Sequence, residues 1–345
     1  GTVQIGQMLL VNVAIHLRLH IPVHSRRFLL QTPLHQPSSQ ATQAQEHAQQ
    51  THPRRQKGHQ DSSIWRTRSR SLSVNGAGLV RYLYGLPVAL ALWFGYAAAT
   101  SAHLPPLSPA FFGFALLGGL LQIGGTNLLI MAFGERSFVV GTAYAKTEAV
   151  QGAVFALWLL GEVLTPLVWL GIAISVVGVM TLSLGGKGLK LRDVFGALWQ
   201  PAARYGLGAG LLFALTSIAV KRATQTLGDD DVILRALTSL VAVVALQLVM
   251  QGSYVILRER GQWRAVLGSW RTSMWVGLLA ATGSAFWFTA FASAPVALVR
   301  TVGQVEVIFT LLLGHYYLRE PLKRAEALGL ALVVIGVIAS VIGSG

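Results

Sequence analysis

From residue 72 to the C-terminus, long apolar stretches alternate with short polar segments. Each stretch approaches the length of about 20 residues that an α-helix needs to cross a bilayer. The pattern predicts nine membrane spans: Val80–Ala99, Pro109–Phe133, Ser137–Glu162, Leu167–Leu184, Tyr205–Val220, Val232–Leu257, Trp275–Ala292, Val296–Tyr317 and Ala325–Ile342. We therefore expect an all-α integral membrane protein that crosses the cell membrane many times.

Composition supports this expectation. Of the 345 residues, 53% are hydrophobic and 12% are charged, which is too apolar for a soluble domain. Cysteine is absent, so disulfides and thiolate metal sites are excluded. The formal net charge of +14 would suggest nucleic acid in a soluble protein. Here we expect a lipid bilayer and no nucleic acid, because most Lys and Arg lie between the spans.

The distribution of basic residues predicts an orientation. Most of them fall on one side of the predicted spans, in the groups Arg66–Arg81, Arg136, Lys187–Arg204, Arg258–Arg271 and Arg319–Arg324. The positive-inside rule places this side in the cytoplasm and the C-terminus outside. In this interpretation Arg81 belongs to the polar flank of the first predicted span.

The apolar part of the chain is duplicated. A shift of 158 residues lays Glu148 on Glu306 and Glu162 on Glu320, and it also aligns two glycine pairs, Gly171 with Gly329 and Gly178 with Gly336. Paired glutamates are rare in apolar sequence, so the register is strong evidence for an internal repeat. We expect a first repeat with four spans at 69–186, a basic linker at 187–203 and a second repeat with five spans at 204–345.

Residues 1–68 do not follow this pattern. They are polar and rich in His and Gln, and they contain no apolar run long enough to cross a bilayer. Three interpretations are open: a metal-binding tail, a disordered tail, or non-native sequence in place of a lost first span. The third is favoured, because Tyr205–Val220 has no counterpart in the first repeat. A complete five-helix repeat has an odd number of spans, so two copies in tandem would be inverted, as in secondary transporters.

The two glutamates are the first candidates for function. An ionisable group inside a span is expensive and usually faces a cavity or a partner. In inverted repeats, Glu148 and Glu306 would lie on opposite walls of one cavity, where they could couple proton movement to transport. The alternative is a buried Glu that only specifies packing. Further candidates for binding substrate or protons are Asn127, Tyr144, Lys146, Gln151, Arg300 and Gln304.

Two groups of charges allow a structural alternative. Lys146 and Arg300 either neutralise the two glutamates in ion pairs or, in the case of Arg300, bind a substrate carboxylate. Glu162 and Glu320 come directly before the next predicted span. We expect them to cap the N-terminus of that next helix rather than to act in transport.

A family resemblance rests on the repeated motifs. Residues 147–150 (TEAV) and 159–162 (LLGE) return as residues 305–308 (VEVI) and 318–322 (LREPL). Over about residues 69–344 the chain thereby resembles the EamA family of the drug/metabolite transporter superfamily. The resemblance implies two inverted five-helix repeats, ten helices in all, and often an exporter of amino acids or other small metabolites. The family pattern also has a first helix near residues 45–68, which is missing here.

These features predict a permease that moves small polar metabolites, amino-acid-like or cationic, by alternating access. No GxxxxGK[ST] loop is present in the sequence, so we expect proton coupling or exchange rather than ATP as the drive. We expect no enzymatic activity, no cofactor and no metal, and a homodimer is possible. The alternatives are a membrane-embedded enzyme and a non-transporting remnant that lacks the first helix.

Overall fold

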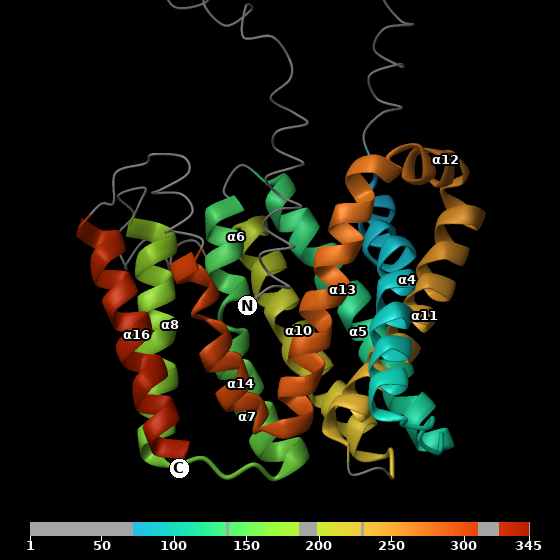
Figure 1. Ribbon diagram of the computed structural model, residues 1–345. Coiled ribbons are helices and arrows are strands. Elements are labelled where there is room, and N and C mark those ends of the chain that lie inside the picture. The colour runs from blue at the N-terminus through green and yellow to red at the C-terminus, as the bar shows by residue number, and fades with distance from the viewer. Residues whose placement is uncertain (1–71, 136–137, 186–198, 229–230, 310–323, 345) are drawn as a thin grey trace, which may run out of the picture. The chain divides into compact units, whose positions relative to one another are not determined.

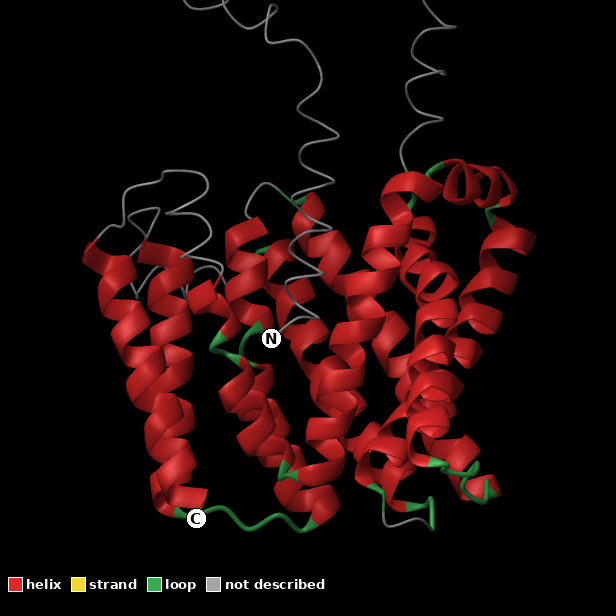
Figure 2. Ribbon diagram, viewed as in Figure 1, coloured by secondary structure: helices red, strands yellow, loops and turns green. Residues whose placement is uncertain are grey.

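The computed structural model describes residues 72–135, 138–185, 199–228, 231–309 and 324–344. All regular elements within these ranges are helices (Figure 1; Figure 2). The predicted segment 1–68, Glu320 and most of the linker 187–203 lie outside the described residues. The structure confirms the all-α membrane fold.

Within the described residues, the first half contains five helical elements: α4 (Val74–Thr100), α5 (Pro109–Gly134), α6 (Phe138–Ala145), α7 (Glu148–Leu160) and α8 (Pro166–Gly185). Their starts follow from local chemistry. Ser73 and Ser108 cap α4 and α5 by accepting hydrogen bonds from backbone amides in the first turn. Pro109 and Pro166 occupy the first position of α5 and α8, where a missing N–H costs nothing.

Among the described residues, the second half repeats this order with two additional helices, α10 (Pro201–Gln225) and the short α12 (Arg260–Gly268). Its other elements are α11 (Val232–Arg258), α13 (Trp270–Ser293), α14 (Val296–Gly303), a helical segment at 306–309, and α16 (Arg324–Ser344). Helix α11 begins at Val232, one repeat offset of 158 residues after Val74 at the start of α4. The duplication seen in the sequence therefore extends to this helix boundary.

Six of these helices are long and apolar enough to cross a membrane: α4, α5, α10, α11, α13 and α16. In α8, the apolar segment Pro166–Leu182 is shorter. The two remaining predicted spans, Ser137–Glu162 and Val296–Tyr317, are not continuous helices. The first is broken between Ala145 and Glu148 and the second after Gly303. The nine spans stay a prediction, and the two that carry Glu148 and Glu306 are broken helices rather than continuous ones.

Helices α8 and α16 pack side by side through the duplicated glycines (Figure 1). A Cβ added to Gly171 would lie 2.6 Å from the carbonyl oxygen of Gly336, and one added to Gly178 would lie 2.8 Å from that of Gly329. Each glycine thus meets the repeat equivalent of the other, along helices that run in opposite directions. A two-fold axis between the halves produces such a reciprocal contact. The inverted arrangement stays a prediction, and this contact supports it.

Helix α10 lies against α5 and against both pieces of the broken helix. A Cβ on Gly210 would lie 3.0 Å from the carbonyl oxygen of Ala145 and 3.4 Å from the amide nitrogen of Glu148, so α10 passes directly beside the break. Small residues permit this close approach between membrane helices. On the other side of the described unit, α4 packs against α11 and α13.

Candidate functional site

The site is built on two helix breaks at equivalent positions of the repeat. Helix α6 ends at Ala145 and α7 begins at Glu148, and Figure 2 shows the loop between them among the surrounding helices. Helix α14 ends at Gly303, and helical structure resumes at 306. Each second piece therefore begins at a glutamate. Non-helical backbone is tolerated at membrane depth only where protein or a cavity covers it.

Polar side chains support the first break. The Thr147 hydroxyl donates to the carbonyl oxygen of Tyr144 at 2.6 Å, and the Gln151 side-chain amide donates to Thr147 Oγ1 at 2.8 Å. The side chain of Gln151 therefore stabilises the turn between α6 and α7. Such local hydrogen bonds offer the backbone an alternative to the continuous helix.

Each glutamate forms an ion pair with a base from the other half. The guanidinium Nη1 of Arg300 lies 3.3 Å from Glu148 Oε2. The ammonium of Lys146 pairs with the carboxylate of Glu306. All four side chains are buried, with at most 9% of any residue exposed. The structure therefore places the two breaks together through two pairs that join the halves.

Arg300 is held by more than its carboxylate. Its Nε donates to Ser217 Oγ at 2.8 Å and its Nη2 donates to the carbonyl oxygen of Phe213 at 2.6 Å, both on α10. The guanidinium also lies over the rings of Trp287 and Phe291, 5.1 and 5.2 Å from the ring centroids. A planar guanidinium suits this combination of bonds and stacking. Arg300 is thus oriented from three sides before it meets Glu148.

The geometry favours the ion-pair interpretation of Lys146 and Arg300. A buried charge is strongly destabilising when its partner is lost, at about 3–5 kcal/mol. Each of the two carboxylates here has a positive charge beside it, so each pair is neutral as a whole. The roles of these residues in transport stay predictions.

The three other candidates make different contacts. Tyr144 packs in an apolar cluster with Val140, Ala143 and Ala203. Asn127 donates to Asn75 Oδ1 at 2.9 Å, within a polar group on α4, α5 and α11. Gln304, in the second break, accepts a hydrogen bond from the Ser175 hydroxyl on α8.

Glu162 acts at a helix end, but not at the expected one. Its Oε2 accepts from the backbone amide of Val296, the first residue of α14, at 2.8 Å. Its Oε1 lies 2.9 Å from Lys221 Nζ, and Lys221 also donates to the carbonyl oxygen of Ala294 at 2.7 Å. Glu162 therefore caps α14 of the other half and not α8, which follows it in the chain.

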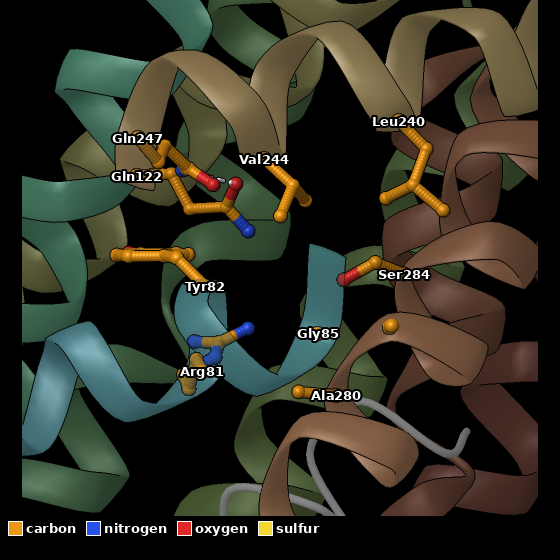
Figure 3. A pocket seen from close by; sticks show the side chains of 10 residues that line it. Arg81, Tyr82, Gly85, Gln122, Leu240, Val244, Gln247, Ala280 and Ser284 are labelled. Atoms are coloured by element: carbon orange, nitrogen blue, oxygen red, sulfur yellow. Dashed lines mark hydrogen bonds between the residues drawn. The ribbon is translucent and has the colours of Figure 1, made fainter. Parts of the chain in front are cut away.

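Two small cavities lie in this region, and one of them adjoins the Glu148–Arg300 pair. One is lined by Glu148, Arg300, Phe213, Thr216, Val220, Trp287, Phe288 and Phe291, together with Gln122 and Ser284. The other, shown in Figure 3, is lined by Arg81, Tyr82, Gly85, Leu240, Val244, Gln247, Ala280 and Ala281, again with Gln122 and Ser284. The two shared residues make the cavities neighbours. We call them the pair cavity and the Arg81 cavity.

The sequence analysis misplaced Arg81. It was expected in the polar flank of a span, yet it lies within α4 and is only 4% exposed. Helix α4 starts six residues earlier than predicted, because Ser73 caps a first turn of small residues that carries little apolar signal. The start of the second-half equivalent at Val232, read back by the repeat offset, would have revealed this.

Comparison with known proteins agrees with the fold. Residues 200–342 match the model of the EamA-like transporter family, which confirms the resemblance found in the sequence over this part of the chain. No curated protein matches the chain. A solved structure described only as the crystal structure of a protein is similar, with a TM-score of 0.59 at 14% identity. The match covers 81% of this chain and 93% of that one, and at this identity it shows a common fold alone.

Proposed function

The second half of the chain, residues 200–342, belongs to the EamA-like transporter family, and from this premise we propose that the protein is a permease. It moves a small polar metabolite, amino-acid-like or cationic, across the cell membrane by alternating access. The drive is proton coupling or exchange. The export direction is part of the same proposal.

One observation carries the proposal: two broken helices bring their charged residues together between the halves. Broken helices at a repeat interface are how secondary transporters build sites at membrane depth. Lys146 pairs with Glu306, and Arg300 with Glu148, so both pairs connect one half to the other. Any movement that separates the halves must therefore rearrange both pairs.

The free space in this conformation is small. The pair cavity offers about 50 Å³ to water-sized groups and the Arg81 cavity about 10 Å³. Since roughly 10–15 Å³ on this scale holds one water, the Arg81 cavity has room for about one water-sized group and the pair cavity for a few. We interpret this conformation as a closed state of the permease. To admit a substrate, the helices around the two cavities must move apart.

A proton provides a way to open the pairs. Protonation of Glu148 would remove the charge that holds Arg300, and the remaining hydrogen bonds to Ser217 and Phe213 would then fix Arg300 to α10 alone. The same reasoning applies to Glu306 and Lys146. Proton uptake would therefore loosen contacts between the halves, which is the event that alternating access requires.

The test uses the full chain in proteoliposomes that contain radiolabelled common L-amino acids and their decarboxylated amines. Glu148→Gln leaves the buried Arg300 without its partner, so a loss of function can reflect folding. The double variant Glu148→Gln/Arg300→Gln removes both charges and serves to separate the two effects. Glu162→Gln is the matched control, because it breaks an ion pair outside the breaks.

We expect wild type and Glu162→Gln to accumulate a substrate in response to a pH gradient. The double variant should fold and exchange substrate but lose the response to the gradient. Transport by both Glu148→Gln and Glu306→Gln with the wild-type pH dependence would refute a coupling role. Conversion of a probe into a product would indicate the enzyme alternative, and no flux of any probe would indicate the remnant.

A further inference from the structure

We propose that Arg81 forms an anion subsite that binds the carboxylate of the transported molecule. The inference rests on the proposed function, because it names the chemistry of that substrate. It assigns the anion to Arg81 rather than to Arg300, which already has a carboxylate partner. Arg81, on α4, is the buried cation of this region that has no ion-pair partner among the described residues.

Arg81 differs from the other buried cations of the site. Among the described residues it has no ion pair, and its one hydrogen bond runs from Nη1 to Thr126 Oγ1 at 3.3 Å. The Nε of Arg81 is also buried, and it has no hydrogen-bond partner among the described residues. Lys146 and Arg300, by contrast, each face a glutamate.

A buried guanidinium in this situation is expensive. Burial of an ionised group costs several kcal/mol unless opposite charge and hydrogen bonds compensate. Arginine keeps its proton in proteins, so it cannot relieve the cost by becoming neutral. A ligand that brings a negative charge into the Arg81 cavity would supply the missing compensation.

The surroundings of Arg81 suit a polar ligand. In Figure 3 its guanidinium points into the space between α4, α11 and α13, with the side chains of Gln122, Gln247 and Ser284 around the same space. Gln247 donates to Gln122 Oε1 at 2.9 Å, which fixes the two amides relative to one another. The cavity therefore combines one fixed cation with neutral hydrogen-bonding groups.

This combination selects a carboxylate. A guanidinium matches the planar, two-oxygen geometry of a carboxylate and can bind it with two parallel hydrogen bonds. Arg81 is the only cation among the residues that line this cavity, so it balances one negative charge rather than the two of a phosphate. The neighbouring pair cavity carries the rings of Trp287, Phe288 and Phe291, which would contact an apolar side group.

The small size of the Arg81 cavity indicates in which conformation the ligand binds. The Arg81 cavity has room for about one water-sized group, comparable to one carboxylate oxygen. The rest of a metabolite would extend toward the pair cavity through Gln122 and Ser284, which both cavities share. Binding is therefore expected with the open conformation, followed by closure around the bound carboxylate.

The experiment compares carboxylates with their neutral counterparts on the full chain in detergent and in proteoliposomes. Each common L-amino acid is matched with its amide and its decarboxylated amine, and sodium chloride is the inorganic probe. Binding is measured by thermal stabilisation and transport by counterflow. The variants are Arg81→Gln and Arg81→Lys, with the exposed Arg271→Gln as the matched control.

We expect at least one carboxylate to stabilise and to be transported by wild type and Arg271→Gln, while its amide and amine do neither. Arg81→Gln should weaken its binding by about 10- to 100-fold, as expected for loss of a charged hydrogen-bond partner. Arg81→Lys, which keeps the charge, should recover part of this affinity. Chloride should not replace the carboxylate.

Other outcomes separate the subsite from the proposed function. Transport of amines or amides that is unchanged by Arg81→Gln would overturn the subsite and leave the permease standing. Carboxylate binding that depends on Arg81 without any transport would support the subsite and refute the permease. Equal stabilisation by chloride and by every carboxylate would overturn the subsite, because Arg81 would then hold an inorganic counter-ion.

Discussion

The glycine contact between α8 and α16 gives the sharpest test of the fold. In Gly336→Ala, the new Cβ would lie 2.5 Å from the carbonyl oxygen of Gly171 and 2.5 Å from the amide nitrogen of Ser175. Both neighbours are backbone atoms of α8, so no side chain can rotate away. The helices must instead move apart by about 1 Å to restore an ordinary contact distance.

The size of the effect follows from this displacement. Overpacking in a well-packed interior costs about 1–3 kcal/mol, and separated helices also lose dispersion contacts along their length. Small residues at membrane-helix interfaces matter because close packing drives the association. We expect Gly336→Ala to lower the free energy of unfolding by about 1–3 kcal/mol, or roughly 5- to 150-fold in the folding equilibrium.

The matched control is Gly113→Ala in α5, where an added Cβ would have no atom within 4 Å. An alanine there should be neutral or should stabilise the helix by up to about 1 kcal/mol, because it lowers the entropy of the unfolded chain. Unfolding is followed by circular dichroism while SDS is added to dodecyl-maltoside micelles. Gly178→Ala should resemble Gly336→Ala, since the repeat makes the two positions equivalent. Agreement of all three variants within about 0.5 kcal/mol would refute the close contact.

Two further predictions concern helix ends. Asp231 caps α11 and also accepts from the Tyr96 hydroxyl at 2.8 Å, so Asp231→Ala should cost about 0.5–2 kcal/mol of stability. Burial raises the pKa of the Asp231 carboxyl, but hydrogen bonds from the Leu234 amide and from Tyr96 outweigh it and leave the pKa below its usual value. This contribution is therefore present above pH of about 4 and lost as pH falls through the lowered pKa, and a pH titration of unfolding should show a flatter profile for Asp231→Asn. Gly161 ends α7 at φ 70°, so Gly161→Ala should lower the thermal stability by about 1 kcal/mol, unlike the helical Gly113→Ala.

The sequence predicted the helices wherever apolar residues dominate a whole turn. It missed the first turns of α4, because residues 74–79 (VNGAGL) are small and their helical structure depends on the Ser73 cap and on contacts with Glu259 and Gln262 across the fold. This error placed Arg81 outside the membrane. The internal repeat contained the missing information, since the apolar start of α11 is easier to recognise than that of α4.

The helix breaks could not be predicted from local pattern. Residues 137–162 are apolar enough to form one helix, and Lys146 and Glu148 then appear on different faces of it. Their positions make sense only when Glu306 and Arg300 of the other half are present to pair with them. The repeat drew attention to the two glutamates, while the partner of each depends on how the halves pack.

The charges around the two cavities constrain the coupling between proton and substrate. Among the described residues, the buried charges of Lys146, Glu148, Arg300 and Glu306 sum to zero, so Arg81 adds one excess positive charge. A purely cationic substrate would add to this excess, whereas a carboxylate would balance it. Protonation of Glu148 would increase the positive charge further and would strengthen the binding of an anion nearby, because charges interact strongly in a medium of low polarity. By linkage, a bound carboxylate then favours the protonated site to the same extent. In the proposed permease, Glu148 and Arg81 would therefore favour loading of proton and anion on the same conformation, which predicts that substrate and proton leave the cell together.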